Sequence, residues 1–401
     1  MTPVLGGAAL PADLAARVGA GAAELQRRGI GPGARVAIGD GDVLSWFLAC
    51  DRRGAAALVL EPGWSARERA GVLADARPDT VVEGTPDAGS GTVEDIPVDL
   101  AAPFYLPTTS GSSGTPKVLQ RSRASWLRSF EALGAVPGPV LVAGPLSSSL
   151  FLFGALHALW CGAELRLAPR LSAAAARGAA TVHVVPAMLP ELAAVPFELV
   201  VCGGAHVPEG LRRPELLEYY GSAEHSLIAI RRDGVLRPVP GVDLEVRAGE
   251  LWVRSPLAVD GRLRGGVLDP SPEWTSVGDR VDIVDGVLTV HGRESATIGS
   301  GGFLVAAEEV EAVLRAVPGV SDVVVAGSPH PRLGAVVTAV VEGEPVLADL
   351  RAAARAGLDP RKRPRIWLRA KEIPRTPAGK PARAALTAAL AAGTLAAEPL
   401  R

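Results

Sequence analysis

The sequence has few of the residues on which several classes of protein depend. Its three cysteines, Cys50, Cys161 and Cys202, lie far apart, which excludes a disulfide scaffold and a Cys-x-x-Cys metal site. The 41 Lys and Arg residues nearly balance the 43 Asp and Glu residues, giving a formal net charge of −2. Because a near-neutral surface has no field that would hold a polyanion, nucleic acid is not an expected partner.

The sequence also lacks a long hydrophobic run. Its longest apolar stretch, residues 150–163, includes His157 and is shorter than the roughly 20 residues that a membrane-spanning helix needs. Residues 1–19 do not place a basic leader before an apolar block, so they do not read as a secretion signal. We therefore expect a cytoplasmic protein without membrane insertion.

The residues that are abundant predict a large folded chain. Hydrophobic residues make up 48% of the sequence and charged residues 21%, which excludes wholesale disorder, although aromatic residues reach only 4%. A length of 401 residues corresponds to two or three domains of roughly 100–200 residues each.

The first half of the chain alternates between helix and strand patterns. Helical periodicity in residues 14–28 and 44–53 is followed each time by a short apolar strand pattern, and the alternation returns between residues 140 and 201. Strands and helices at this spacing predict βαβ units and a mainly parallel sheet.

The pattern changes twice after residue 228. Short strands with Gly or Asp at their turns predict antiparallel structure, which we expect to be a small β-barrel. From residue 293 a helix, two strands, a second helix and a polar, Pro-rich tail predict a compact α+β module. The expected fold class is α/β. An N-terminal domain, residues 1–292, would combine layered βαβ sheets with the barrel, and residues 293–401 would form a C-terminal α+β domain.

Residues 108–117 carry the clearest chemical signal. Hydroxyl residues and two glycines precede Lys117 in this segment. Glycines let backbone N–H groups approach a polyanion closely, hydroxyls donate further hydrogen bonds, and the lysine adds a positive charge. The segment is not a Walker loop, because Lys117 follows Gly114 by three residues and no Ser or Thr comes next. Composition alone leaves open that this is a solvated loop.

Together with later segments, this loop resembles the phosphate loop of the adenylate-forming superfamily, which includes acyl-CoA synthetases, adenylation domains and luciferases. The matching segments follow in the superfamily's order along nearly the whole chain. They are Gly203-Gly204-Ala205, Tyr220-Gly221-Ser222-Ala223-Glu224, Ser276-Val277-Gly278-Asp279, Gly292-Arg293 with residues 298–302 and 308–311, and residues 374–383 around Lys380. The form of residues 300–302 is similar to that of compact AMP-dependent ligases for aryl acids and succinylbenzoate.

The resemblance implies a role for each motif. Lys380 would catalyse adenylation and Glu224 would hold Mg²⁺, while Phe151 and His225 would border the acyl group and Gly301 and Gly302 would line a pantetheine tunnel. The implied ATP-binding residues are Thr109, Ser110, Gly111, Ser112, Ser113, Gly114, Lys117, Gly203, Gly204, Ala205, Tyr220, Gly221, Ser222, Asp279 and Arg293.

The implied chemistry suits these residue types. A carboxylate attacks the α-phosphate of ATP and expels pyrophosphate, and the acyl-adenylate then acylates coenzyme A. Because negative charge gathers in the transition state, the site needs cations and preorganised donors rather than a strong base. The resemblance further implies that the C-terminal domain is mobile. It would rotate about residues 293–296 to present first Lys380 and then the Gly301-Gly302 face.

Some positions depart from the superfamily's pattern. Ala223 stands where Ser or Thr is usual, Gly299 where a lysine is common, Ser295 at the hinge and Val118 where glycine usually follows the lysine. We therefore expect an AMP-forming carboxylate–CoA ligase but keep two alternatives open. One is an adenylation enzyme that transfers the acyl group to a carrier-protein phosphopantetheine or an amine. The other is a non-catalytic acyl-adenylate binder.

Other candidate residues give weaker evidence of a functional role. The six histidines show no metal-ligand spacing, and Cys202 reads as a small buried residue. Residues 361–365 are either a solvated loop or a basic patch that receives the phosphates of coenzyme A. We expect the substrate to be a modest aliphatic or aromatic monoacid, because no basic residue in a recognisable position between 145 and 230 would pair with a second carboxylate.

Overall fold

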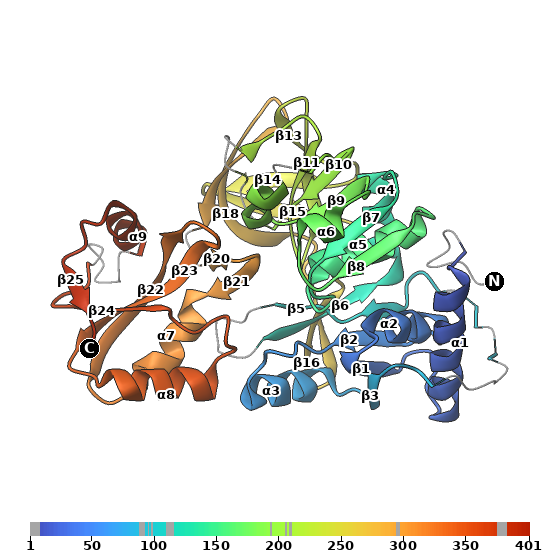
Figure 1. Cartoon of the computed structure of the whole chain (residues 1–401), viewed down its shortest axis with the longest axis horizontal. Helices are drawn as coiled ribbons and strands as arrows, with labels where there is room; N and C mark the ends of the chain where they lie inside the picture. Colours follow the sequence, from blue (N-terminus) through green and yellow to red (C-terminus); the bar gives the residue numbers. More distant parts are fainter. Residues whose placement is uncertain are drawn as a thin grey trace.

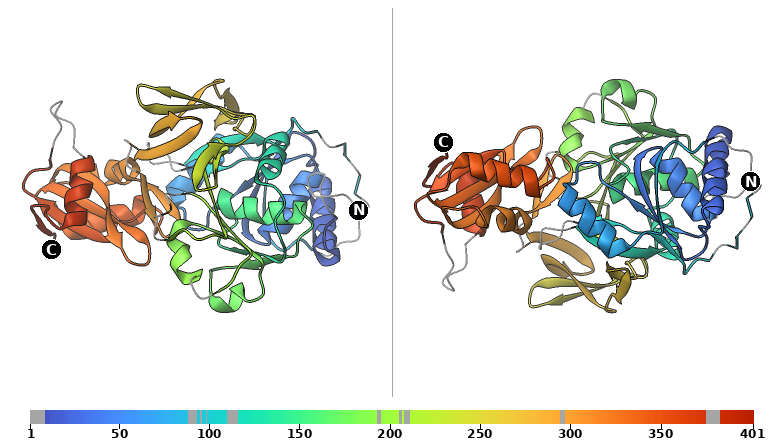
Figure 2. Two further views of the ribbon diagram at one scale, coloured as in Figure 1. Left: turned by 90° about the horizontal axis from the view of Figure 1, so that it is seen from above. Right: turned by 90° about the horizontal axis from the view of Figure 1, so that it is seen from below.

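The computed structural model describes residues 9–87, 93–94, 96–97, 99–109, 116–192, 195–204, 207, 211–293, 297–374 and 383–401. Two large sheets and a small curved sheet make up an N-terminal body, and a fourth sheet makes up a C-terminal module (Figure 1). Helix α1 lies at one end of the long axis and the C-terminal module at the other, and the two views of Figure 2 agree.

The first large sheet has the strand order β17-β16-β6-β4-β2-β1-β3, and β5 pairs with β6. Strands β1, β2, β3 and β4 run parallel, whereas β6, β16 and β17 continue the sheet in antiparallel fashion. The strands are β1 (Arg35–Gly41), β2 (Ala56–Val59), β3 (Thr80–Gly84), β4 (Pro103–Tyr105), β5 (Thr108–Thr109), β6 (Lys117–Ser122), β16 (Gly261–Arg264) and β17 (Val267–Pro270).

Three helices cover the two faces of this sheet. Alternate residues of β1 and β2 enter different cores, because successive side chains of a strand point to opposite faces. Helices α1 (Ala12–Arg27) and α2 (Val43–Arg52) pack in one core, and α3 (Ala66–Ala76) packs in the other.

The second large sheet has the order β13-β12-β11-β10-β9-β7-β8. Strands β7 to β11 are parallel, and β12 and β13 add antiparallel strands at one edge. The strands are β7 (Val140–Ala143), β8 (Leu165–Ala168), β9 (Thr181–Val184), β10 (Leu199–Cys202), β11 (Leu216–Ser222), β12 (Ser226–Arg232) and β13 (Val235–Pro238). The helices are α4 (Arg123–Leu133), α5 (Ser149–Trp160), α6 (Ala173–Ala176) and the 3-10 helix η2 (Pro186–Leu192).

An aromatic cluster fills the core between the two large sheets. Rings from both halves meet edge-on or tilted, as in Phe47–Phe104 at 5.3 Å, Phe104–Trp126 at 5.5 Å and Phe130–Phe153 at 5.0 Å between centroids. Such pairs add roughly 0.5–1.5 kcal/mol beyond the burial of their apolar area. The few aromatic residues of the chain are thus concentrated where the sheets join.

The third sheet is antiparallel, with the order β14-β15-β18-β19, and forms a half-barrel beside the second sheet. It contains β14 (Asp243–Arg247), β15 (Glu250–Arg254), β18 (Thr275–Val284) and β19 (Val287–Arg293). Its last strand ends immediately before residues 294–296, which lie outside the described residues.

The C-terminal module is a six-stranded sheet with helices on both faces. Residues Val323 and Val325 enter the core beneath α7 and α8, whereas Val324 and Ala326 face α9. The elements are β20 (Thr297–Ser300), β21 (Phe303–Ala306), α7 (Ala307–Arg315), β22 (Val320–His330), β23 (Gly334–Gly343), α8 (Leu347–Gly357), β24 (Ile366–Ala370), α9 (Arg383–Ala392) and β25 (Ala397–Pro399).

The α/β fold class predicted from the sequence is confirmed. The expected helices at 14–28 and 44–53 are present as α1 and α2, and the first helix expected after residue 293 is present as α7. The prediction of a polar tail after residue 356 was wrong. Strand β24 pairs with β23 in parallel, β25 pairs with β24, and α9 closes the second core of the module. Within the described ranges, no helix has both the length and the apolar character needed to cross a membrane.

Candidate active site

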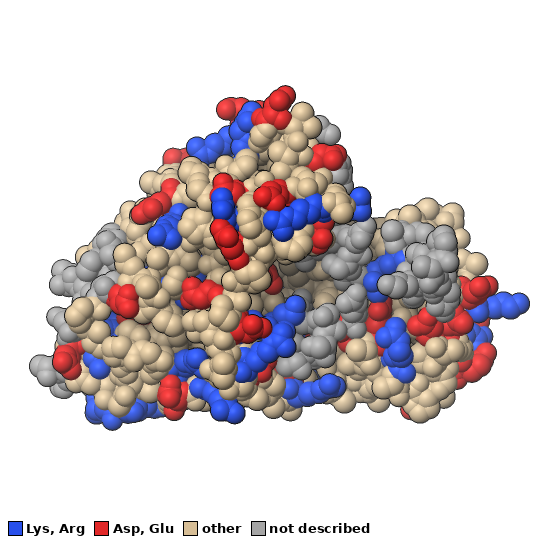
Figure 3. Space-filling view, turned by 180° about the vertical axis from the view of Figure 1, so that it is seen from behind, with Lys and Arg blue, Asp and Glu red and all other residues tan. Residues whose placement is uncertain are grey.

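A cleft of about 2690 Å³ lies between the body and the C-terminal module. Figure 3 shows a hollow between the two parts, on a face where acidic and basic side chains are interspersed. Elements from all four sheets line the cleft. Its walls include Thr109, Lys117, residues 219–227, residues 275–280, residues 149–151 and residues 301–304.

The predicted phosphate loop joins β5 to β6. Thr109 pairs with Lys117 in an antiparallel register, which places both at the mouth of the loop and on the wall of the cleft. The Oγ1 of Thr109 is buried and has no hydrogen-bond partner among the described residues. An orphaned buried hydroxyl at this point suits a bound anion. Ser110, Gly111, Ser112, Ser113 and Gly114 lie outside the described residues.

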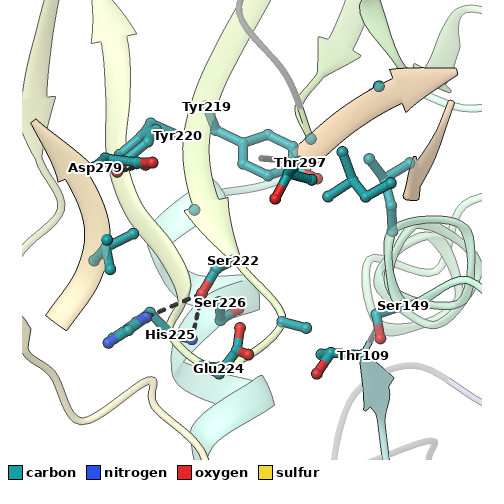
Figure 4. Close-up of a pocket in the computed structure, with 18 of the residues that line it drawn as sticks. Thr109, Ser149, Tyr219, Tyr220, Ser222, Glu224, His225, Ser226, Asp279 and Thr297 are labelled. Carbon is teal, nitrogen blue, oxygen red and sulfur yellow. Dashed lines mark hydrogen bonds between the residues drawn. The ribbon is translucent and has the colours of Figure 1, made fainter. Parts of the chain in front are cut away.

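The predicted metal-binding motif forms the tip of the hairpin between β11 and β12. Ser222 pairs with Ser226, so Ala223, Glu224 and His225 make the turn. Glu224 is half-buried on the wall of the cleft, and Figure 4 shows it below Ser222, with Thr109 to its right on another strand. The backbone carbonyl of Glu224 accepts a hydrogen bond from Val259 N at 2.8 Å, which fixes the turn without using the carboxylate.

Hydrogen bonds within the protein hold Ser222 and His225. The Ser222 hydroxyl lies 3.0 Å from His225 Nδ1 (Figure 4), and His225 Nε2 lies 2.6 Å from Thr275 Oγ1. The His225 side chain is buried, and both of its ring nitrogens have partners. The imidazole therefore links the hairpin tip to β18. Ser222, which was expected at the nucleotide, lines the cleft, and its hydroxyl is at hydrogen-bond distance from His225.

The predicted nucleotide residues lie on facing strands. The Tyr220 hydroxyl donates to Asp279, and Asp279 pairs with Arg293 in the register of β18 and β19; the side chain of Arg293 lies outside the description. The neighbouring Tyr219 lies against Gly203, where a Cβ would be 2.2 Å from the tyrosine ring. Gly203 thus permits a close approach that any other residue would block. Gly204 lines the cleft, and Ala205 lies outside the described residues.

Arg121 is a residue of the cleft wall that the sequence analysis did not single out. It lies on β6 with Lys117 and Leu119, and alternation along the strand brings all three to the cleft. Its guanidinium donates to the carbonyls of Leu257 and Ala223, the latter at 2.8 Å. Burial lowers the pKa of Arg121 to about 10. The alternation of side chains along the strand after Lys117 was the signal from which the position of Arg121 could have been predicted.

We expect Arg121→Met to destabilise the protein and loosen the hairpin tip. The substitution leaves buried carbonyls without a donor, which costs about 1–3 kcal/mol for each such group. Chemical denaturation should therefore show a free energy of unfolding lower by about 2–4 kcal/mol. Arg128→Met is the matched control, because Arg128 is exposed on the following helix. Equal stability of the two variants would contradict this role.

The Gly301-Gly302 turn and Phe303 also face the cleft. Gly302 has a φ of +83°, and a Cβ there would lie 2.7 Å from Val185 at the end of β9. The turn therefore approaches the body closely. Phe151, the expected aromatic gate, lines the same cleft and has its ring against Gly144.

Residues 361–365 were left open as a solvated loop or a basic surface patch, and neither reading fits Lys362. Lys362 is buried between two carboxylates, and Arg361 is paired with Glu61 and Asp359. Arg363 donates to two backbone carbonyls. These charges act within the protein, so little of the cluster remains to receive phosphates.

No cage of three or more His, Cys, Asp or Glu side chains occurs in the part of the chain that the structure describes. Mg²⁺ does not require one, because it is usually bound through one or two carboxylates together with substrate phosphates and water. Glu224 beside the phosphate-loop strands offers that kind of donor set. The residues present therefore fit a magnesium ion that arrives with the nucleotide.

Comparisons with known proteins identify the family. Residues 309–380 match the model of the AMP-binding enzyme C-terminal domain. An uncharacterised acyl-CoA ligase of Bacillus subtilis, YhfT, is 30% identical over 343 residues, which cover 74% of this chain and 71% of that protein. The chain belongs to the acyl-CoA ligase family of adenylate-forming enzymes. As a member of it, this acyl-CoA ligase is an AMP-forming enzyme that uses ATP and coenzyme A.

Solved structures show the same fold. The o-succinylbenzoate CoA synthetase MenE of Bacillus subtilis, a double mutant bound to the product analogue OSB-NCoA, superposes with a TM-score of 0.84. It is 22% identical, over 97% of this chain and 94% of that one. The amide bond synthetase McbA of Marinactinospora thermotolerans gives a TM-score of 0.81 and 25% identity, over 96% and 95% of the two chains.

Proposed function

We propose that this acyl-CoA ligase activates a carboxylic acid at the cleft and transfers the acyl group to coenzyme A. In the first half-reaction a carboxylate oxygen bonds to the α-phosphorus of ATP and the bond to pyrophosphate breaks. In the second, the sulfur of coenzyme A attacks the acyl carbon, its proton is lost, and AMP leaves. The observation that carries the proposal is that one cleft brings together Thr109, Lys117, Glu224, Asp279 and the Gly301-Gly302 turn.

We assign the nucleotide to the edge of the cleft between the two large sheets. The loop from Thr109 to Lys117 would receive the β- and γ-phosphates through backbone N–H groups, hydroxyls and the lysine charge. Asp279 would accept hydrogen bonds from the ribose hydroxyls, and Gly203 and Gly204, which follow β10, would border the adenine. Glu224 would hold Mg²⁺, which when bound supplies positive charge to the phosphates.

Ala223 has no hydroxyl, so the phosphate contact that Ser or Thr would make at this position must come from another group. Its neighbour Ser222 is directed toward His225, so that hydroxyl does not replace the missing one. We infer that the buried Thr109 hydroxyl and Lys117, across the cleft from the hairpin tip, make the phosphate contacts of this enzyme.

We propose that the acyl group lies against apolar side chains of α4, of α5 and of the residue that follows β9. Trp126, Phe151, Phe153 and Val185 line this part of the cleft. A polar pair adjoins this lining, in which the hydroxyls of Tyr105 and Ser149 lie 3.0 Å apart. An apolar lining of this kind supports an aliphatic or aromatic monoacid as substrate.

We further propose that residues 293–401 act as a mobile domain. In the pose of this structure the Gly301-Gly302 turn lines the cleft. This turn is the part of the domain that is expected to border pantetheine. Rotation about residues 293–296 would bring Lys380 to the carboxylate for the first half-reaction.

The test is ATP-dependent release of pyrophosphate across a panel of carboxylic acids, with and without coenzyme A. The proposal predicts release that depends on the acid and that turns over repeatedly only when coenzyme A is present. Release that stops near one turnover with coenzyme A, but continues with an amine or a phosphopantetheinyl carrier protein, would assign a different acceptor. Nucleotide binding without release for any acid would contradict the activation step.

A further inference from the structure

A buried ion cluster joins the C-terminal module to the body. Lys362 Nζ lies 2.6 Å from Glu68 Oε1 on α3 and 2.6 Å from Glu309 Oε1 on α7. The side chain of Lys362 is 1% exposed, and those of Glu68 and Glu309 are 0% exposed. Helix α3, which packs on the first sheet, lies next to the C-terminal module in Figures 1 and 2. The cluster therefore lies at the contact between the two parts.

The body holds Glu68 in position independently of the module. Ser65 and Glu68 form a capping box at the start of α3, in which each side chain accepts a hydrogen bond from the other's backbone N–H. Glu68 Oε2 also accepts from the Ser65 hydroxyl at 2.8 Å. One oxygen of Glu68 is thus used by its own helix, and the other is left for Lys362.

A second set of contacts connects the cluster to the cleft. Arg361 Nη2 lies 2.9 Å from Glu61 of the body, and its guanidinium lies 4.2 Å from the centroid of the Phe303 ring. Glu61 also accepts from the Ser147 hydroxyl, on the cleft wall, at 2.7 Å. Phe303 directly follows the Gly301-Gly302 turn. The position of that turn is therefore tied to the same loop that carries Lys362.

The residue type at position 362 is informative. The chain has only four lysines among its 41 Lys and Arg residues, namely Lys117, Lys362, Lys371 and Lys380. An ammonium group is a compact charge that fits between two carboxylates, whereas a planar guanidinium needs more room and a different arrangement of acceptors. A lysine at this buried point, in a chain that uses arginine almost everywhere else, matches the narrow space between α3 and α7.

The energetics of the ion cluster favour a role in fixing the orientation of the C-terminal module. Removing three charged groups from water has a large cost, and it is recovered only when the charges meet at hydrogen-bond distance. Burial, with Glu68 facing the same ammonium, raises the pKa of Glu309 to about 7 despite the attraction of Lys362. Such a cluster adds little net stability. It does penalise every orientation of the module in which Lys362 is buried without both carboxylates.

We propose that Lys362 is the positioning residue for the pose in which the Gly301-Gly302 turn lines the cleft. By joining Glu68 of the body to Glu309 of the module, it holds the module where the pantetheine of coenzyme A would enter. Adenylation, which needs the other pose, does not use this contact. This inference rests on the proposed function, since that function assigns one pose to each half-reaction.

The experiment compares Lys362→Met with the wild type in each half-reaction separately. The acid found in the panel is first used to measure the rate of pyrophosphate release. Acyl-adenylate formed on the enzyme is then mixed with coenzyme A in a single turnover. We expect thioester formation to slow by about tenfold or more and adenylation to stay within about twofold. Lys371→Met, which removes an exposed lysine of the same module, is the matched control and should change neither rate.

Hydrogen exchange of the substrate-free protein gives a readout that does not depend on activity. In Lys362→Met we expect faster exchange of the amides of residues 65–69 and 303–306, with the cores of both parts unchanged. Glu309→Gln, which keeps an acceptor for Lys362, should show a smaller increase.

Unchanged half-reactions and unchanged exchange in Lys362→Met would overturn the proposal. A parallel loss of both half-reactions with a lower melting temperature would also overturn it, because it would indicate a purely structural role. If the wild type releases no pyrophosphate with any acid, the proposed function fails, and the exchange data alone decide whether Lys362 holds the pose.

Discussion

Lys380→Ala is expected to slow acyl-adenylate formation by about 10²–10³-fold, as is typical for the loss of one preorganised group that stabilises developing negative charge. Residue 380 lies outside the described part of the structure, and its role is a prediction from residues 374–383, where the match to the family's C-terminal domain ends. The effect should be large because the attacking carboxylate and the α-phosphate are both anions. A single ammonium between them both neutralises and aligns them.

The test of Lys380 separates the two half-reactions. A chemically synthesised acyl-adenylate should still be converted to the acyl-CoA by Lys380→Ala at close to the wild-type rate, since that step uses the other pose. Lys371→Ala is the control for removal of a lysine from the same module. If Lys380→Ala adenylates normally, the assignment of this lysine is wrong. If it loses both steps equally, the lysine has a structural role.

Glu224→Gln is expected to lower the rate of adenylation by about 10²-fold, because a bound metal ion contributes several kcal/mol of charge stabilisation at transferring phosphates. The substitution preserves the shape of the side chain and removes only its charge. It should not unfold the hairpin, because the turn is fixed by the backbone carbonyl of Glu224 and Val259 N. The specific expectation is a rise in the Mg²⁺ concentration needed for half-maximal rate.

Titration of the initial rate with MgCl₂ at saturating ATP checks this expectation. Glu215→Gln is a suitable control, since Glu215 pairs with Arg213 before β11 and does not line the cleft. An unchanged Mg²⁺ requirement in Glu224→Gln would mean that another group holds the ion. A loss of rate together with a loss of the folded state would show that the carboxylate is structural.

The sequence predicted most of the local structure of the chain. Alternating apolar patterns located α1, α2, α7 and the parallel strands, because each of these elements buries one face or is buried completely. It also predicted a loop at residues 108–117, and Thr109 and Lys117 flank this loop between two strands. The hairpin turn that carries Glu224 was not predicted. Motifs of this kind depend on local geometry, which neighbouring residues determine.

What the sequence could not predict depends on contacts between distant segments. The segment after the second helix of the module read as a polar tail because β24 buries only a narrow stripe, which is recognisable only against β23. The contact of His225 with Thr275 joins residues fifty positions apart in the chain. The burial of Lys362 results from Glu68, which is 294 positions away. No local pattern contains that information.

The central claim, activation of a carboxylic acid as its adenylate, is tested most directly by isotope transfer. The acid that supports pyrophosphate release is labelled with ¹⁸O in both carboxylate oxygens and converted with ATP, Mg²⁺ and coenzyme A. Because a carboxylate oxygen bonds to the α-phosphorus, the AMP formed should carry one ¹⁸O and the acyl-CoA the other, as read by mass spectrometry. AMP without label, or label in inorganic phosphate or pyrophosphate, would contradict the account.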